Sequence, residues 1–176
     1  MTPALDPLLI VRAQAGDLAA FEQLARAIEP ALRRYVTRLT GARGAADDVL
    51  QETFVRIWRG LGWLREPALF RAWAYRIATR EAQRFLRREL KREELTSDES
   101  ELDKLAAPLG DPAARLDLES MLSRISPLAR TVLVAHYFEG LTLDEVAAVA
   151  ELPLGTVKSR LASGLKQARA LMEAAP

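Results

Sequence analysis

The sequence predicts an all-α protein made of two small helical domains, and three observations support this. Apolar residues recur at helical spacing, and no stretch of the 176 residues alternates as a half-buried strand does. Asp-Pro and Ser-Pro pairs precede apolar runs, and Gly follows them. An acidic stretch containing two prolines separates the halves. We expect a helical bundle over residues 1–92, a flexible acidic linker over 93–117, and a four-helix domain with a helix-turn-helix over 118–176.

Composition is that of an ordinary soluble globular protein, with 49% hydrophobic and 28% charged residues. The chain has no cysteine, which excludes disulfides and thiol metal sites. The first residues lack the basic and apolar regions of a signal peptide. No run approaches the roughly 18 apolar residues that span a bilayer. We therefore expect a cytoplasmic protein without membrane insertion.

Charge is unevenly distributed, although the net charge is only +1. Residues 71–92 contain eight Lys/Arg and two Asp/Glu, a net charge of +6, whereas residues 93–119 contain two and nine, a net charge of −7. The segments 1–70 and 120–176 each carry +1. A basic block beside an acidic block suggests a binding surface followed by a solvated tether.

Two helices are predicted before Gly41. The first has Asp6 as its cap. Its apolar face is predicted to comprise Leu8, Val11 and Ala15. The second begins at Asp17 and carries an apolar stripe, which Pro30 is expected to bend or restart.

Two longer helices follow. The helix over about 45–61 is predicted to bury Val49, Leu50, Phe54, Ile57 and Trp58. A loop then leads to a helix over about 70–90, whose cations fall within an arc of about 80° on the helical wheel. These cations are Arg76, Arg80, Arg84, Arg87 and Lys91. Their mutual repulsion would be relieved by a phosphate backbone, which favours nucleic-acid binding over a merely solvated helix face.

The C-terminal half ends in a predicted helix-turn-helix. Thr142 and Glu145 fit a capping box, Pro153 and Gly155 mark a turn, and apolar residues resume at helical spacing from Val157. The second helix opens with residues that can donate to base edges and phosphates: Thr156, Lys158, Ser159 and Arg160. Paired short helices also occur in proteins that never bind DNA.

Nothing in the sequence indicates catalysis, so we expect a protein that is not an enzyme and needs no cofactor or metal. The chain has a single histidine, His136, and lacks the zinc, phosphate-loop and nucleophile motifs. We expect His136 to be a partly buried packing residue rather than a sensor.

Two stretches of the chain resemble conserved regions of the extracytoplasmic-function (ECF) sigma factors of the sigma-70 superfamily. ADDVLQETFVRIWR with FRAWAYRIATREAQRFLRRE resembles the second region, and LSRISPLARTVLVAHYFEGLTLDEVAAVAELPLGTVKSRL resembles the fourth. The resemblance implies a factor that binds core RNA polymerase and directs initiation at promoter DNA. An anti-sigma factor is a further implied partner.

The resemblance implies that the helix over 47–58 docks on the polymerase. The residues matched to this role are Asp48, Gln51, Glu52, Arg56 and Trp58. Acidic residues also favour a helix N-terminus through its dipole, but that does not account for Gln51 and Glu52 in the second turn.

The resemblance also implies two DNA-reading helices. The helix from Phe70 would meet the proximal, minus-ten element as opened DNA, through Trp73, Arg76, Arg80, Arg84, Arg87 and Arg88. Trp63 and Trp73 could stack on a base, although Trp73 is more typical of a core residue. Thr156, Lys158, Ser159 and Arg160 would read the distal, minus-thirty-five element as duplex.

The chain departs from the family pattern at two places. Arg80 stands where an Asn is common, and Glu81 where an apolar or small residue is usual, which affects the expected proximal sequence. Gly164 costs about 1 kcal/mol relative to Ala within a helix, and we expect it to bring the backbone close to DNA. With few bulky or basic residues after Arg160, the distal affinity is expected to be modest.

Two other functions fit parts of the sequence. A stand-alone helix-turn-helix regulator would bind duplex DNA unaided, and a sigma-like mimic would bind only protein. Association with core polymerase and promoter-dependent transcription distinguish the three.

Overall fold

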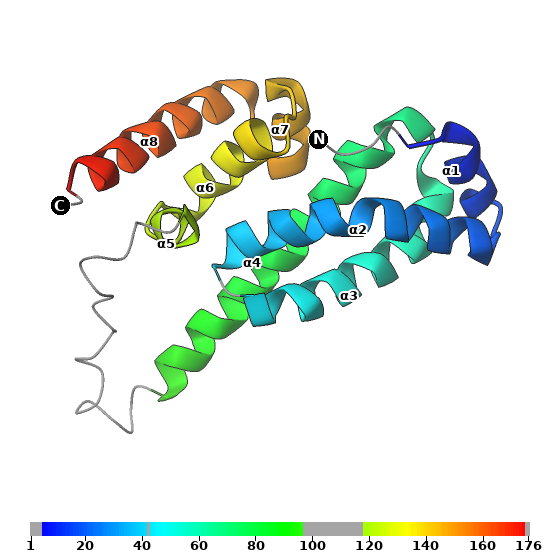
Figure 1. The fold of residues 1–176 in the computed structure, drawn as a ribbon, viewed down its shortest axis with the longest axis horizontal. Helices are drawn as coiled ribbons and strands as arrows, with labels where there is room; N and C mark the ends of the chain where they lie inside the picture. The colour runs from blue at the N-terminus through cyan, green and yellow to red at the C-terminus, as the bar shows by residue number, and fades with distance from the viewer. Residues whose placement is uncertain (1–4, 42, 97–117, 175–176) are drawn as a thin grey trace.

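The computed structural model describes residues 5–41, 43–96 and 118–174, and every regular element in these ranges is a helix (Figure 1). This confirms the all-α class. The fourth helix runs to Thr96, several residues past its predicted end. Most of the predicted linker, residues 97–117, lies outside the described residues. The division into domains at residues 92 and 117 stays a prediction.

The N-terminal half is a bundle of three long helices with a short one across its end (Figure 1). Its elements are α1 (Pro7–Gln14), α2 (Leu18–Thr40), α3 (Arg43–Gly60), the 3₁₀ turns η1 (Leu61–Trp63) and η2 (Pro67–Leu69), and α4 (Phe70–Thr96). Tyr35 on α2 and Tyr75 on α4 are fully buried, with ring centroids 4.9 Å apart. The Tyr35 and Thr79 hydroxyls lie 2.7 Å apart, so α2 and α4 share an apolar core with a hydrogen-bonded centre.

The C-terminal half packs shorter helices against the last one. Its elements are α5 (Leu118–Ser123), α6 (Pro127–Leu133), the π-helical turn η3 (Val134–Phe138), α7 (Leu143–Ala150) and α8 (Leu154–Glu173). In η3 the Glu139 amide donates to the Val134 carbonyl, five residues back. Figure 1 shows α6 and α8 running together above the bundle, with α7 beside the first turns of α4.

Local capping fixes the helix ends where the sequence predicts them. The side chains of Asp6 and Asp17 accept hydrogen bonds from the first turns of α1 and α2. Gly41 ends α2 in the left-handed conformation, with φ 70°. The capping box is confirmed, because Thr142 and Glu145 each bond the backbone amide of the other.

Three expectations about helix faces and continuity are wrong. The buried face of α1 is Ile10 and Ala13, while Leu8 and Val11 are 64% and 47% exposed. The helix is apolar on both sides, so periodicity alone cannot select the face. The expected restart of the helix at Pro30 is wrong, because α2 is continuous from Leu18 to Thr40. Trp58, expected in the core, is 38% exposed.

The two halves are in contact in this structure. The buried apolar residues of both form one continuous core, and α7 packs along α4. Arg130 of α6 donates to the carbonyl of Leu39 on α2, and also to the carbonyls of Ser123 and Ile125. Burial lowers the pKa of Arg130. This guanidinium therefore joins the end of α2 to the start of the C-terminal half.

None of the helices in the described part of the chain is long and apolar enough to cross a bilayer.

Candidate nucleic-acid and protein interfaces

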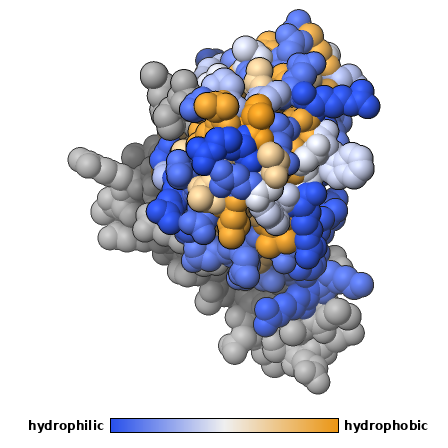
Figure 2. Space-filling model, turned by 90° about the vertical axis from the view of Figure 1, so that its right-hand side faces the viewer, coloured by the Kyte–Doolittle hydropathy of each residue, from blue (hydrophilic) through white to orange (hydrophobic). Residues whose placement is uncertain are grey.

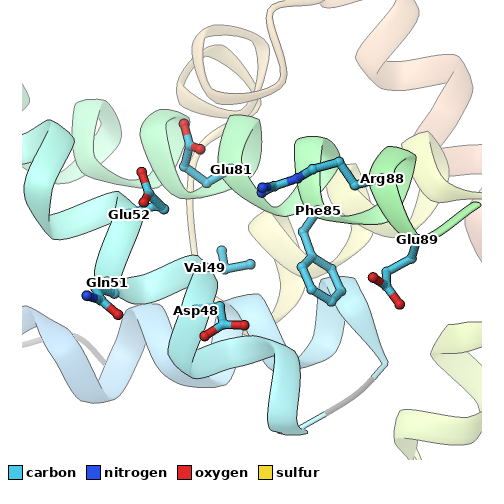
Figure 3. A pocket seen from close by; sticks show the side chains of 8 residues that line it. All are labelled: Asp48, Val49, Gln51, Glu52, Glu81, Phe85, Arg88 and Glu89. Carbon is cyan, nitrogen blue, oxygen red and sulfur yellow. The ribbon is translucent and has the colours of Figure 1, made fainter. Parts of the chain in front are cut away.

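The three polar residues predicted to contact polymerase lie together on α3. Asp48, Gln51 and Glu52 are all exposed and line one pocket of about 380 Å³ between α3 and α4. Figure 3 shows this pocket, with Phe85 pointing into it from α4. The remaining lining residues of α4 are Glu81, Arg88 and Glu89. A polar, water-accessible hollow of this kind suits a hydrogen-bonding protein partner better than an apolar ligand.

Arg56 and Trp58 flank the same surface of α3. Arg56 turns toward α4, where its Nε lies 2.5 Å from the Glu81 carboxylate. Trp58 lies on the other side and packs on Phe21, with ring centroids 4.8 Å apart. Sequence reasoning missed Val55, which is 37% exposed within this surface.

Glu81 is a buried counterion rather than a residue on the outer face of α4. Its side chain is 4% exposed and lies 2.5 Å from Arg56 Nε and 2.8 Å from an Arg84 nitrogen. Two guanidinium partners offset the cost of burying the carboxylate. The expectation that Glu81 alters the preferred proximal sequence directly is not supported by this position. Glu81 instead links the α3 surface to the basic residues of α4.

The arginines predicted to hold the proximal element divide into two groups along α4. Arg84, Arg87 and Arg88 are exposed and line a groove with Arg56. Arg76 is partly buried, and its Nε has no hydrogen-bond partner. It lines a separate, largely apolar groove between α4 and α7.

Arg80 forms an ion pair with Glu151, the residue that ends α7. The Arg80 Nε donates to the Glu151 carboxylate at 2.8 Å, and a second guanidinium nitrogen donates to the other oxygen. This hydrogen bonding lowers the pKa of the Glu151 carboxyl and raises the pKa of Arg80. The two side chains are 46% and 48% exposed, so the pair contributes at most about 1 kcal/mol.

Glu151 also has an unusual backbone. Its φ is 56°, the only positive φ of a non-glycine among the described residues. The left-handed conformation costs an ordinary L-residue roughly 1–2 kcal/mol, and glycine usually occupies this position after a helix. Glu151 thus carries a side chain at a backbone position where glycine would be less strained.

Trp73 packs inside the protein, as its sequence context favoured. It is partly buried, 6.1 Å from the Phe70 ring, and a Cβ on Gly60 would lie only 3.0 Å from its ring. Trp63 in η1 is 87% exposed instead. Figure 2 views the end of the molecule that carries α1, where apolar side chains interrupt a mostly hydrophilic surface. Of the two tryptophans, Trp63 is therefore the one accessible for stacking on a base.

A second carboxylate, Glu139, lies between the two halves. Its side chain is 4% exposed and accepts a hydrogen bond of 2.7 Å from the Tyr75 hydroxyl and one of 3.4 Å from Arg38. Arg71 donates to the Glu139 carbonyl. Glu139 thus bonds to both α2 and α4, a contact that no sequence pattern indicates.

The residues predicted to read the distal element occupy the first turns of α8. Lys158, Ser159 and Arg160 are exposed, and Thr156 is partly exposed. The Ser159 hydroxyl donates to the Thr156 carbonyl at 2.9 Å, which fixes its orientation. The start of α8 thus presents two cations and two hydroxyl side chains on one accessible helix end.

Two minor expectations can be compared with the structure. Gly164 is buried, and a Cβ there would lie 3.2 Å from Leu133 and 3.3 Å from the Ala129 carbonyl. The expectation that Gly164 approaches DNA is wrong, because it lets α8 pack closely on α6. His136 is partly buried, with its Nδ1 2.8 Å from the Leu141 carbonyl, which agrees with a packing role.

Comparison with known proteins gives two family matches in chain order. Residues 24–92 match the model of Sigma-70 region 2, and residues 115–167 match that of Sigma-70, region 4. The chain is 29% identical to the RNA polymerase sigma-H factor of Pseudomonas aeruginosa, covering 92% of this chain and 90% of that protein. It is also 29% identical to the ECF RNA polymerase sigma-E factor of Haemophilus influenzae, covering 89% of each.

Two solved structures share the fold. One is CnrH in complex with the cytosolic domain of CnrY, with a TM-score of 0.73, 26% identity, and coverage of 97% of this chain and 99% of that chain. The other is the sigma factor RpoE with the anti-sigma factor NepR from Bartonella quintana, with a TM-score of 0.69, 23% identity, and coverage of 89% and 98%.

Proposed function

The chain belongs to the sigma-70 family of RNA polymerase sigma factors, in its extracytoplasmic-function group, and from this premise we propose a division of tasks among its helices. The α3 surface binds core RNA polymerase, α4 binds the opened proximal element, and the start of α8 reads the distal element. The observation that carries this proposal is that the two family regions coincide with the two helical units presenting these surfaces.

Polymerase binding is assigned to Asp48, Gln51, Glu52, Arg56 and Trp58. Asp48, Gln51 and Glu52 line one polar pocket, and the exposed Arg56 and Trp58 lie further along the same helix, which supports a protein contact. Glu81 holds Arg56 in place from the buried side.

Promoter binding is assigned to two helices with different tasks. On α4, Arg80 contacts a base of the proximal element, and the DNA backbone is held by Arg76, Arg84, Arg87 and Arg88. Exposed Trp63 stacks on an unpaired base. Trp73 supports this surface by packing rather than by touching DNA. On α8, Lys158 and Arg160 contact phosphates or base edges, and Thr156 and Ser159 add hydroxyl contacts.

The protein supplies no chemistry of its own in this proposal. It acts in the cytoplasm as a specificity subunit, and the polymerase performs the reaction. An anti-sigma factor is the proposed regulatory partner, since two structures of similar fold are complexes with CnrY and with the anti-sigma factor NepR.

The proposal is tested by two linked measurements. The purified full chain should co-purify with core RNA polymerase, and the mixture should transcribe from specific genomic promoters while core alone does not. Absence of a stable complex with core would refute the proposal. Tight, sequence-specific binding of the free protein to duplex would favour a stand-alone regulator, and polymerase binding without transcription would favour a mimic.

A further inference from the structure

We propose that the groove between α4 and α7, lined by Trp73, Arg76 and Asp144 among others and hereafter the α4–α7 groove, binds a free amino acid with a large apolar side chain. Its volume of about 420 Å³ lies in the range of small-molecule sites, which often form where two packed units meet. It lies where α7 runs beside the first turns of α4 (Figure 1). The inference goes beyond the proposed function and does not depend on it, because the ligand would bind the free chain without polymerase or DNA.

The α4–α7 groove has an apolar lining that suits such a side chain. The lining comes from the segment before α4, from the first turn of α4 and from α7, and comprises Leu64, Leu69, Ala72, Trp73 and Ala148. Leu69 is 52% exposed, and Trp73 is only partly buried. An apolar side chain in the groove would remove this accessible apolar surface from water, which favours binding.

Arg76 offers a cation for the carboxylate of the ligand. Its Nε is buried and has no hydrogen-bond partner. Arg80 and Arg84 on the same helix each pair with a carboxylate, whereas Arg76 forms no hydrogen bond or ion pair with any residue that the structure describes. A buried donor without an acceptor is destabilising and is rare in folded proteins. A ligand carboxylate would supply the missing acceptor.

Asp144 offers an anion for the ammonium group of the ligand. It lines the groove from the first turn of α7, is exposed, and has no hydrogen bond or ion pair to any described residue. Glu145 lines the groove beside it, but its carboxylate already accepts from the amide and the hydroxyl of Thr142 in the capping box. Within the described part of the chain, the groove thus carries an unpaired carboxylate on α7 and an unpaired guanidinium on α4.

This arrangement of charges favours a zwitterion over other ligands. A ligand with a negative charge alone would be repelled by Asp144 and Glu145, and a DNA strand lying in the groove would be repelled for the same reason. A ligand with a positive charge alone would leave the Nε of Arg76 without an acceptor. An amino acid carries a carboxylate, an ammonium group and a side chain on one carbon atom, so it complements the guanidinium, the carboxylate and the apolar lining together.

Calorimetric titration of the full chain with L-phenylalanine tests the inference. Three further compounds each lack one of the matched groups: 3-phenylpropionate has no ammonium group, 2-phenylethylamine has no carboxylate, and glycine has no apolar side chain. We expect each of them to bind at least about tenfold more weakly than L-phenylalanine, because each loses one complementary contact.

Two results of this titration would overturn the inference. One is the absence of measurable binding for both L-phenylalanine and L-leucine, because both side chains are large and apolar. The other is equal affinity for L-phenylalanine and either singly charged compound, because the guanidinium and the carboxylate of the groove would then not act together.

Two substitutions test the residues assigned to the ligand. Arg76→Gln removes the guanidinium, and Asp144→Asn removes the charge of the exposed carboxylate while keeping its size. Each should weaken the binding of L-phenylalanine at least about tenfold. Arg26→Gln on α2, which removes an exposed guanidinium paired with Glu22, is the matched control and should bind as the wild type does. Asp144→Asn decides the question if Arg76→Gln fails to fold, and wild-type affinity in Asp144→Asn would overturn the inference.

The emission of Trp73 tests the location of the ligand independently. The chain contains three tryptophans, so Trp58→Phe with Trp63→Phe leaves Trp73 in the groove as the remaining one. L-phenylalanine should shift the emission of this variant to shorter wavelength, with the dissociation constant that calorimetry gives, because the ligand replaces water beside the ring. Binding without any change in Trp73 emission would place the ligand elsewhere and overturn the inference.

The outcomes distinguish this inference from the proposed function, because none of these measurements uses polymerase or DNA. A chain that binds L-phenylalanine but supports no transcription with core polymerase refutes only the proposed function. A chain that supports transcription but binds neither amino acid refutes only the amino-acid site.

Discussion

The two helices assigned to DNA, α4 and α8, differ in what their cations already contact. On α4, Arg80 is bonded to Glu151, Arg84 is paired with Glu81, and Arg76 is partly buried. On α8, Lys158 and Arg160 are simply exposed. A basic residue on a helix face is therefore not by itself an available DNA ligand, because its availability depends on the tertiary partner.

The difference has an electrostatic reason. The α4 stripe concentrates like charges that repel one another, and nearby carboxylates relieve this repulsion within the folded chain. The first turns of α8 carry only two cations, so little repulsion needs to be relieved. Substitutions of the α4 arginines or of their carboxylate partners should therefore alter the free energy of unfolding and the contact between α4 and α7. Substitutions of the two α8 cations should alter DNA binding alone.

The largest effect is expected for Glu139→Ala. Removing this buried carboxylate takes away a hydrogen-bond acceptor from the Tyr75 hydroxyl and the counterion of Arg38, and we expect a loss of about 3 kcal/mol in the free energy of unfolding. Urea unfolding followed by circular dichroism measures it. Lys158→Ala on α8 is the control and should change stability by less than about 0.5 kcal/mol. Equal losses for both variants would remove the distinction between the two helices.

A somewhat smaller effect is expected when α8 loses its cations. Lys158→Ala with Arg160→Ala should weaken use of the distal element by about 2 kcal/mol, the low end for two specific contacts, because both side chains are exposed. The measurement is transcription from paired promoters with and without the distal element. An equal decrease on the promoter lacking that element would show that α8 does not read it.

A change in base preference is expected for Arg80→Ala. Loss of one exposed guanidinium should change discrimination within the proximal element by about 1 kcal/mol, while binding to core polymerase stays unchanged. Selection of promoters from a randomised proximal library measures the preference. Retained preference with lost polymerase binding would transfer Arg80 to the protein interface.

The smallest effect is expected from pH. The Arg80 ion pair lowers the pKa of Glu151, so its contribution to the contact between α4 and α7 is complete above the ordinary carboxyl pKa of about 4.3. It is lost as pH falls through the lowered pKa. When Trp58 and Trp63 are replaced by Phe, Trp73 beside α7 is the remaining tryptophan, and its fluorescence emission reports loss of the contact between α4 and α7. Glu151→Gln should abolish the acid transition.

Features set by neighbouring residues could be predicted from the sequence. The cap at Asp6, the start of a helix at Asp17 and the box of Thr142 with Glu145 depend on spacings of a few residues, and all form as expected. The positions of the helices and the exposure of Lys158 and Arg160 follow from periodicity in the same way.

Features set by distant residues could not be predicted. Glu81 and Glu139 are buried because arginines from other helices meet them, and no pattern within one helix indicates that. The buried face of α1 could not be predicted because both faces are apolar, and the helices packed against α1 determine which face is buried. The partner of Gly164 could not be predicted either. A glycine in the sequence shows that a side chain is absent, but not that α6, rather than DNA, occupies the space beside it.

The π-helical turn η3 determines the direction in which Glu139 faces after α6. Its widened hydrogen bonding, from the Glu139 amide to the Val134 carbonyl, accommodates one residue more than an α-helical turn does. If Val134–Phe138 tightened to α-helical hydrogen bonding without losing a residue, everything after it would rotate by about 100°. Glu139 would then turn away from Tyr75. The bond between Glu139 and Tyr75 thus depends on one widened turn that contains no residue of a proposed binding surface.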